Sequence, residues 1–122
     1  MSEPRKQPGR GKQERYIQPS ILLGLQSKSS YGYELIQEIH QFGFIQGQAP
    51  PGMIYRHLRQ LEDDGLVTSE WMTEGAGPAK RMYAITEDGR EMLSLWVDYM
   101  EVQRGRLADF IARYKKETVE AK

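Results

Sequence analysis

The sequence predicts a mostly α-helical fold with one small β-hairpin, arranged as a winged helix-turn-helix and followed by a long C-terminal helix. Two patterns lead to this fold class. Apolar residues recur at helical spacing in three segments ahead of Gly65 and in a longer one after Thr86, and the residues between alternate as strands do. We therefore expect a disordered basic tail at 1–15, a winged-helix domain at 16–86 and a C-terminal helix at 87–122.

Composition excludes several classes of protein. The chain has 122 residues, a formal net charge of zero and no cysteine, which rules out a disulfide framework, a thiolate nucleophile and a cysteine metal site. It contains neither a secretory h-region nor an apolar run of about eighteen residues, so we expect a cytoplasmic protein without a membrane partner. The zero net charge argues mildly against nucleic-acid binding, for which a basic domain is typical.

The charge is unevenly distributed, and the first fifteen residues are basic. Prolines and glycines interrupt this polar segment, which predicts disorder. Either the tail adds non-specific affinity for DNA, or it is a plain disordered terminus. Its basic residues, opposed by Glu3 and Glu14, are Arg5, Lys6, Arg10, Lys12 and Arg15.

Two helices are expected before residue 50. The first begins at Pro19 and ends in the polar residues 26–29. Its apolar face is formed by Ile21, Leu22 and Leu25.

The second helix is expected over residues 30–44, with Ser29 or Ser30 as its N-cap. Gly32 beside that cap allows a close approach of a neighbouring helix or of a phosphate, and the packing role is favoured because it needs no ligand. The apolar face has intervals of four, four and three residues and consists of Tyr31, Leu35, Ile39 and Phe42.

A third helix is expected between a Pro-Pro pair at 50–51, which suits a helix start, and Gly65, which suits the position after a helix end. At roughly 100° per residue, Ile54, Leu58 and Leu61 lie within about 60° of one another and predict a buried stripe. An ordinary surface helix and a helix that lies in a DNA groove both fit this segment alone. The opposite face presents Gly52, Arg56, Arg59 and Asp63.

Residues 66–73 and 80–85 alternate in polarity and are separated by the turn-forming run EGAGPA, which predicts a β-hairpin. The linker is longer than the two-residue minimum and ends at Lys80 and Arg81, so we expect a projecting tip that touches a phosphate backbone. A helix, a tight stop and a basic-tipped hairpin, in this order, are typical of a winged helix-turn-helix.

After the hairpin, Thr86 is expected to cap a helix of about 29 residues, or about 44 Å. A small domain cannot cover that length, so a second copy of the chain is expected to bury the far half in a homodimer. The apolar seam that would form this interface occupies an arc of roughly 120°. It comprises Met92, Trp96, Tyr99, Met100, Leu107, Phe110, Ile111 and Tyr114.

The same seam permits a second interpretation. Trp96 and Met100 are one turn apart, with Tyr99 beside them, and flat apolar molecules fit between such side chains. From the pattern alone, core packing is favoured over an effector pocket.

Three segments carry a resemblance to a known family. They are SILLGLQSKSSYGYELIQEI (20–39), PPGMIYRHLRQLEDDGLVTSEW (50–71) and GAGPAKRMYAITEDGREML (75–93). In unbroken order they resemble the PadR family of bacterial transcriptional regulators, and the single C-terminal helix is similar to the subfamily with a short C-terminal region. The sequence departs from the family pattern at Met53 and Arg56, which puts its base preference in doubt.

The resemblance implies a dimeric repressor that docks its third helix in the major groove of operator DNA and touches the adjacent backbone with its wing. Some members of the subfamily hold planar hydrophobic effectors at the dimer interface, which leaves pocket and plain packing both open here. Arg56 is the expected base contact, because a guanidinium binds guanine bidentately. Gly52, Met53 and Gln60 are expected near the groove, and the expected phosphate contacts are Tyr33, Tyr55, Arg59, Lys80 and Arg81.

Catalysis is not expected. His40 and His57 lie on different helices without a carboxylate at ligand spacing, and Ser29-Ser30 has no evident base partner. We expect neither a cofactor nor a metal, and both histidines are expected to be satisfied at helix edges rather than to act as pH switches. The alternative function is a winged-helix module for protein contacts, in which Arg56 and Arg59 meet an acidic partner.

Overall fold

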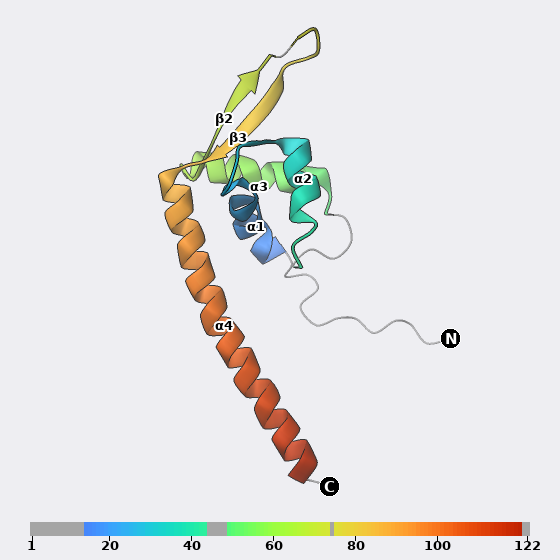
Figure 1. The fold of residues 1–122 in the computed structure, drawn as a ribbon, viewed down its shortest axis with the longest axis vertical. Helices are drawn as coiled ribbons and strands as arrows, with labels where there is room; N and C mark the ends of the chain where they lie inside the picture. The colour runs from blue at the N-terminus through green and yellow to red at the C-terminus, as the bar shows by residue number, and fades with distance from the viewer. Residues whose placement is uncertain (1–13, 44–48, 74, 121–122) are drawn as a thin grey trace, which may run out of the picture.

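The computed structural model describes residues 14–43, 49–73 and 75–120. The expected tail over residues 1–13 therefore lies outside the described part of the chain. Figure 1 shows three short helices gathered into one group, a β-hairpin that projects from it, and a long C-terminal helix that leaves it as a rod. This arrangement confirms the predicted fold class. The elements are α1 (Ile17–Leu25), β1 (Ser30–Tyr31), α2 (Gly32–Ile39), α3 (Pro51–Asp63), β2 (Val67–Met72), β3 (Lys80–Ile85) and α4 (Glu87–Glu120).

One hydrophobic core holds the three short helices and the base of the hairpin together. The stripe predicted on α3 is confirmed, since Ile54, Leu58 and Leu61 are each 0% exposed. Burial of apolar surface on this scale is the main force that fixes the position of α3. The other members of the core are Ile17, Ile21, Leu22, Leu25, Leu35, Ile39, Val67, Tyr83 and Leu93.

A short strand, β1, was not predicted. It pairs antiparallel with β3, so the sheet has the order β1-β3-β2, and Ser30 lies opposite Tyr83. The expectation that Ser29 or Ser30 caps the second helix is wrong, because Ser30 is extended and buried in the sheet and Tyr31 is the N-cap residue. The helix also ends at Ile39, earlier than expected, in a turn through Phe42.

The end of α3 is fixed by its backbone. Gly65 has a positive φ of 77°, a conformation that glycine adopts without steric cost. Its N–H donates to the carbonyl of Glu62, and the N–H of Leu66 donates to the carbonyl of Leu61, which together form a Schellman motif. The predicted stop at Gly65 is therefore confirmed, and it turns the chain directly into β2.

The C-terminal helix begins where predicted and is longer than expected. The Thr86 hydroxyl accepts a hydrogen bond from the Gly89 N–H at 3.0 Å, which confirms Thr86 as the N-cap. The helix has 34 residues, so it extends about 51 Å. Only Gly89 and Leu93 are buried along it, and Figure 1 shows its far half away from the rest of the chain. Within the described residues, no helix has the length and apolarity needed to cross a bilayer.

The buried Tyr83 makes stability depend on pH at the alkaline end. Burial raises the pKa of its hydroxyl above 10.0, although the nearby Arg81 opposes the shift. Between pH 10.0 and the raised folded pKa, the unfolded chain releases this proton while the folded chain retains it, so stability falls as pH rises. Urea unfolding at a series of alkaline pH values should show a shallower decline for Tyr83→Phe than for the natural chain. The half-exposed Tyr33→Phe serves as the matched control, and equal slopes for all three proteins would contradict the assignment.

Candidate nucleic-acid interface

The face of α3 opposite the core is polar and open. Arg56, Arg59 and Gln60 are exposed, and nothing lies within 4 Å of the position that a Cβ on Gly52 would occupy. Met53 differs from this set, because its side chain is half-buried and packs against the core. The sequence-predicted groove residues on α3 thus share one surface, with Met53 at its edge.

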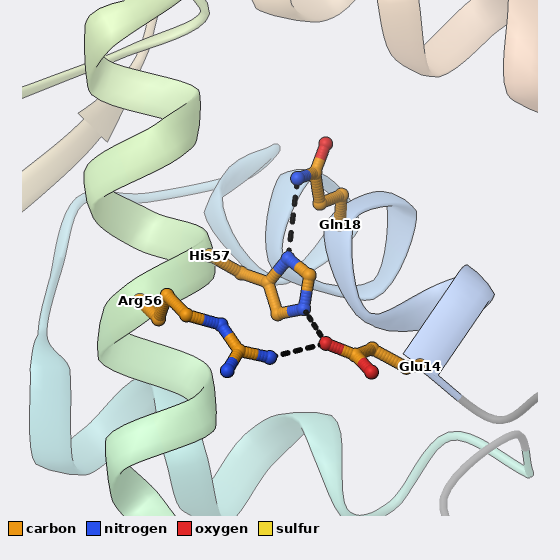
Figure 2. A network of polar contacts seen from close by, with 4 residues as sticks. All are labelled: Glu14, Gln18, Arg56 and His57. Carbon is orange, nitrogen blue, oxygen red and sulfur yellow. Dashed lines mark hydrogen bonds and ion pairs between the residues drawn. The ribbon is translucent and has the colours of Figure 1, made fainter. Parts of the chain in front are cut away.

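A chain of polar contacts links Arg56 to the segment before α1. Figure 2 shows the guanidinium of Arg56 and the imidazole of His57 both directed at Glu14. Arg56 Nη2 donates to Glu14 Oε1, and His57 Nε2 lies 3.0 Å from the same oxygen. On the other side of the ring, His57 Nδ1 lies 3.2 Å from the amide nitrogen of Gln18. Glu14 thereby joins the N-terminal segment to the exposed face of α3.

The electrostatics of this network favour an ionised Glu14. The hydrogen bond from His57 and the charge of Arg56 hold the pKa of the Glu14 carboxyl below its usual value of 4.5, although desolvation opposes them. Because the Gln18 amide nitrogen can only donate, Nδ1 of His57 accepts and Nε2 carries the proton toward Glu14. His57 is therefore hydrogen-bonded through both of its ring nitrogens.

Both histidines have partners, as expected for satisfied side chains at helix edges. In addition to the bonds of His57, Nε2 of His40 accepts a hydrogen bond from the Ala49 N–H at 3.0 Å. Among the described residues, no group of three or more His, Asp or Glu side chains could hold a metal ion.

Tyr55 anchors α2 to α3. A Cβ on Gly32 would lie 2.7 Å from the Tyr55 ring and 2.8 Å from its hydroxyl, so only glycine permits this approach. The packing role predicted for Gly32 is confirmed. The Tyr55 side chain is nevertheless 40% exposed, which leaves its outer edge on the same surface as Arg59.

The basic residues of the wing turn back toward the helices. The Lys80 ammonium lies 5.2 Å from the centroid of the Tyr33 ring and 5.7 Å from that of Tyr31, and these two rings stack 5.8 Å apart. Both contacts are within the range of a cation–π interaction. Lys80 is thus held between the wing and α2 rather than placed at a free tip.

Arg81 is similarly engaged. Its Nε donates to Ser69 at 2.8 Å, its Nη2 lies 3.5 Å from a carboxylate oxygen of Glu62, and its guanidinium lies 5.5 Å from the Trp71 ring centroid. These contacts tie the wing to α3. Between them is a hollow of about 680 Å³ lined by Tyr55, Arg59, Glu62, Asp63, Trp71, Arg81 and Tyr83.

The near half of α4 carries the aromatic residues predicted for an effector site. The Trp96 ring makes edge contacts with Tyr16 and Tyr99, at centroid distances of 6.2 and 6.0 Å. Arg15 Nη1 donates to the Tyr99 hydroxyl at 3.4 Å. Beside these rings is an open hollow of about 460 Å³ lined by Arg15, Met92, Leu95, Trp96 and Tyr99. Met100 is half-buried in the same helix and does not line it.

The far half of α4 presents the rest of the predicted seam to solvent. The Phe110 side chain is 74% exposed, Tyr114 is 64% exposed and Leu107 is 62% exposed. No other element of the described chain covers them, so this apolar surface has no partner among the described residues.

Sequence reasoning missed Glu14, Gln18 and Tyr31. Glu14 and Arg15 were placed in the tail, but they lie in a short 3₁₀ turn and contact α3 and α4. The spacing of four between Glu14 and Gln18, typical of one helix face, was the available signal. Tyr31 was assigned to the apolar face of a helix. The available signal was its spacing of two from Tyr33, because side chains two residues apart lie on one face of an extended segment.

Comparison with known proteins places these features in a family. Residues 21–95 match the family model described as the transcriptional regulator PadR-like family. The probable transcriptional regulator Rv1176c of Mycobacterium tuberculosis is 32% identical over 78 residues, which are 64% of this chain and 41% of that protein.

The negative transcriptional regulator PadR of Bacillus subtilis is 31% identical in an alignment of 81 positions that covers 62% of this chain and 42% of that protein. The chain thus spans about two fifths of the length of these curated relatives. The crystal structure of Bacillus subtilis PadR in complex with operator DNA matches with a TM-score of 0.60 and 26% identity, over 68% of this chain and 47% of that one.

A nearly full-length match extends the likeness to the C-terminal helix. The crystal structure of TM0937, described as a conserved protein of unknown function and a potential transcriptional factor, has a TM-score of 0.73 and 32% identity over 93% of this chain and 96% of that chain. Since the family model covers residues 21–95 of the 122, this chain belongs to the PadR-like family of transcriptional regulators.

Proposed function

We propose that the protein is a homodimeric repressor that binds operator DNA sequence-specifically, with α3 in the major groove and the β2–β3 wing on the adjacent backbone. The observation that carries this proposal is the position of Arg56 and Arg59 on an exposed face whose opposite side is fully buried. The crystal structure of a relative in complex with operator DNA supports the same use of the fold. The negative regulation named for that relative supports repression.

The two arginines of α3 have different roles in this proposal. Arg56 lies near the centre of the exposed face and contacts a base edge, where a guanidinium can bind guanine O6 and N7 together. Gly52, Gln60 and the edge of Met53 flank it in the groove. Arg59 contacts phosphate together with Tyr55 and Arg81, which line the same hollow between α3 and the wing. Tyr33 and Lys80 line a second hollow on the wing and are the other proposed phosphate contacts.

The far half of α4 supports dimerisation. The aromatic and aliphatic seam is exposed along the far half of α4, and two copies that pack their seams together would bury it on both. A twofold pair of winged helices would also meet two half-sites of a duplex.

The hollow beside Trp96 is the proposed place for a planar hydrophobic effector. Three of its lining side chains, Met92, Leu95 and Trp96, are apolar, and Arg15 and Tyr99 supply polar groups at its rim. The turn before α1 and the helix α4 both line this hollow, and an effector there would release DNA only if it binds the DNA-free arrangement more tightly.

Substitution of the two arginines separates base reading from phosphate binding. Arg56→Ala should relax selectivity at one operator position by about 1–3 kcal/mol, while Arg59→Ala should weaken binding to all sequences alike and reduce the salt slope by about one. Fluorescence anisotropy with operator variants at several salt concentrations measures both effects. Equal losses at every sequence from both changes would contradict the division, and no selective binding by the natural chain would favour a protein-contact module.

Disruption of the seam should separate the chains. Phe110→Asp places an unpaired carboxylate in the proposed interface, so sedimentation velocity should show a shift from dimer toward monomer and a loss of operator affinity. Ala108→Asp adds the same charge on the opposite face of α4 and should remain dimeric. A natural chain that sediments as a monomer would contradict the proposal.

Tryptophan fluorescence can locate the effector site, because the chain has only two tryptophans, Trp71 and Trp96. In Trp71→Phe, a planar polycyclic dye should quench the remaining Trp96 by stacking on it. In Trp96→Phe, emission from the exposed Trp71 should not change. Quenching of Trp71 alone, or of neither residue, would argue against a pocket on α4.

A further inference from the structure

The network around Glu14 brings together side chains from three separate places in the chain. Glu14 lies in the turn before α1, Gln18 lies in α1, and Arg56 and His57 lie in α3 (Figure 2). A single carboxylate oxygen of Glu14 meets both Arg56 Nη2 and His57 Nε2. The carboxylate is therefore held in place by His57 independently of Arg56.

The hydrogen bonds that hold Glu14 run in one direction, from Gln18 through His57 to the carboxylate. Gln18 donates to His57 Nδ1, and the other ring nitrogen, Nε2, directs its proton to Glu14. The His57 side chain is only 15% exposed, so the core side of α3 holds the ring still. Gln18 thus orients the His57 ring, and the ring orients the Glu14 carboxylate, which accepts the hydrogen bond from Arg56.

The contact leaves most of the guanidinium free. An arginine carries five N–H donors, and Glu14 engages one terminal nitrogen of Arg56. Enough donors remain for the two parallel bonds that guanine O6 and N7 accept. The Arg56 side chain is also 63% exposed, so its outer edge is open to a base.

We infer that Glu14 is a specificity-determining residue of the DNA interface, which positions the Arg56 guanidinium for guanine and restrains it from neighbouring phosphates. The inference rests on the proposed function, since it assigns a second residue to the same surface. A long, flexible arginine can reach a phosphate as readily as a base. Held by a fixed carboxylate, it keeps one orientation, and the negative charge of Glu14 disfavours a phosphate at that place.

The opposite role, in which Glu14 competes with DNA for Arg56, fits the geometry less well. If Glu14 competed with DNA for Arg56, the position of its carboxylate should depend on the contact with Arg56. The bond to His57 instead holds the carboxylate in place without Arg56. A base edge also brings no negative charge to displace the carboxylate. Binding of guanine therefore leaves the Arg56–Glu14 contact in place.

Two substitutions separate the reach of Glu14 from its charge. Glu14→Asp keeps the charge but shortens the side chain, and Glu14→Gln keeps the length but removes the charge. Operator selected from random duplexes, and its single-base variants, would be titrated against each protein at fixed salt. We expect Glu14→Asp to lose about two- to tenfold in selectivity at the position read by Arg56, a typical coupling for neighbouring residues, while affinity for random duplex stays unchanged.

The charge variant should behave differently. Glu14→Gln should bind random duplex more tightly, because a negative charge leaves the DNA-facing surface, and should lose selectivity at the same base position. Asp63→Asn removes an equal charge from the exposed face of α3 and is the matched control. It should tighten binding to all sequences without changing base preference.

The double variants complete the test. In an Arg56→Ala background, Glu14→Asp and Glu14→Gln should leave base preference unchanged, because the positioned group is absent. Selectivity equal to that of the natural chain in both single variants, with tighter binding to every duplex, would overturn the inference and leave the proposed function intact. A natural chain that shows no preference among duplexes would overturn the proposed function itself.

Discussion

The burial of one face of α3 is the constraint on which the interface depends. Ile54, Leu58 and Leu61 are sealed against α1, α2 and the sheet, so the helix cannot rotate without exposing them to water. This fixes the direction of the opposite face and hence of Arg56 and Arg59. The Schellman motif at Gly65 then sets where the wing begins relative to that face. The core and one backbone turn thus determine the geometry of the surface proposed to meet DNA.

Local signals in the sequence were sufficient for these features. Periodicity identified the α3 stripe, the glycine at 65 identified its end, and Thr86 identified the start of α4, because each depends on residues within a few positions of one another. The long seam of α4 was also readable, since the apolar side of this helix follows from spacing alone. Its exposure in a single chain agrees with the expectation that one small domain cannot cover it.

Contacts between distant residues were not readable in this way. The strand β1 exists because Ser30 meets Tyr83, 53 positions away, so a two-residue segment that resembles a helix cap becomes part of a sheet. The same reason hid Glu14, whose partners are 42 and 43 positions along the chain. Lys80 and Arg81 were read as a free basic tip, although nearby aromatic rings and Glu62 hold them. Pairing across the fold, rather than local propensity, decides such positions.

The internal pairing of cations also reconciles a net charge of zero with the proposed DNA-binding surface. Arg81 meets Glu62 and Arg56 meets Glu14, in pairs whose side chains are 30–63% exposed. Exposed ion pairs contribute only about 0–1 kcal/mol each, so a phosphate can replace a carboxylate at Arg81 at little cost. A base edge carries no net charge and cannot replace Glu14 in this way. In the proposed complex, Arg81 exchanges its partner when DNA binds, whereas Arg56 keeps its own, and that difference would distinguish affinity for any duplex from recognition of a particular one.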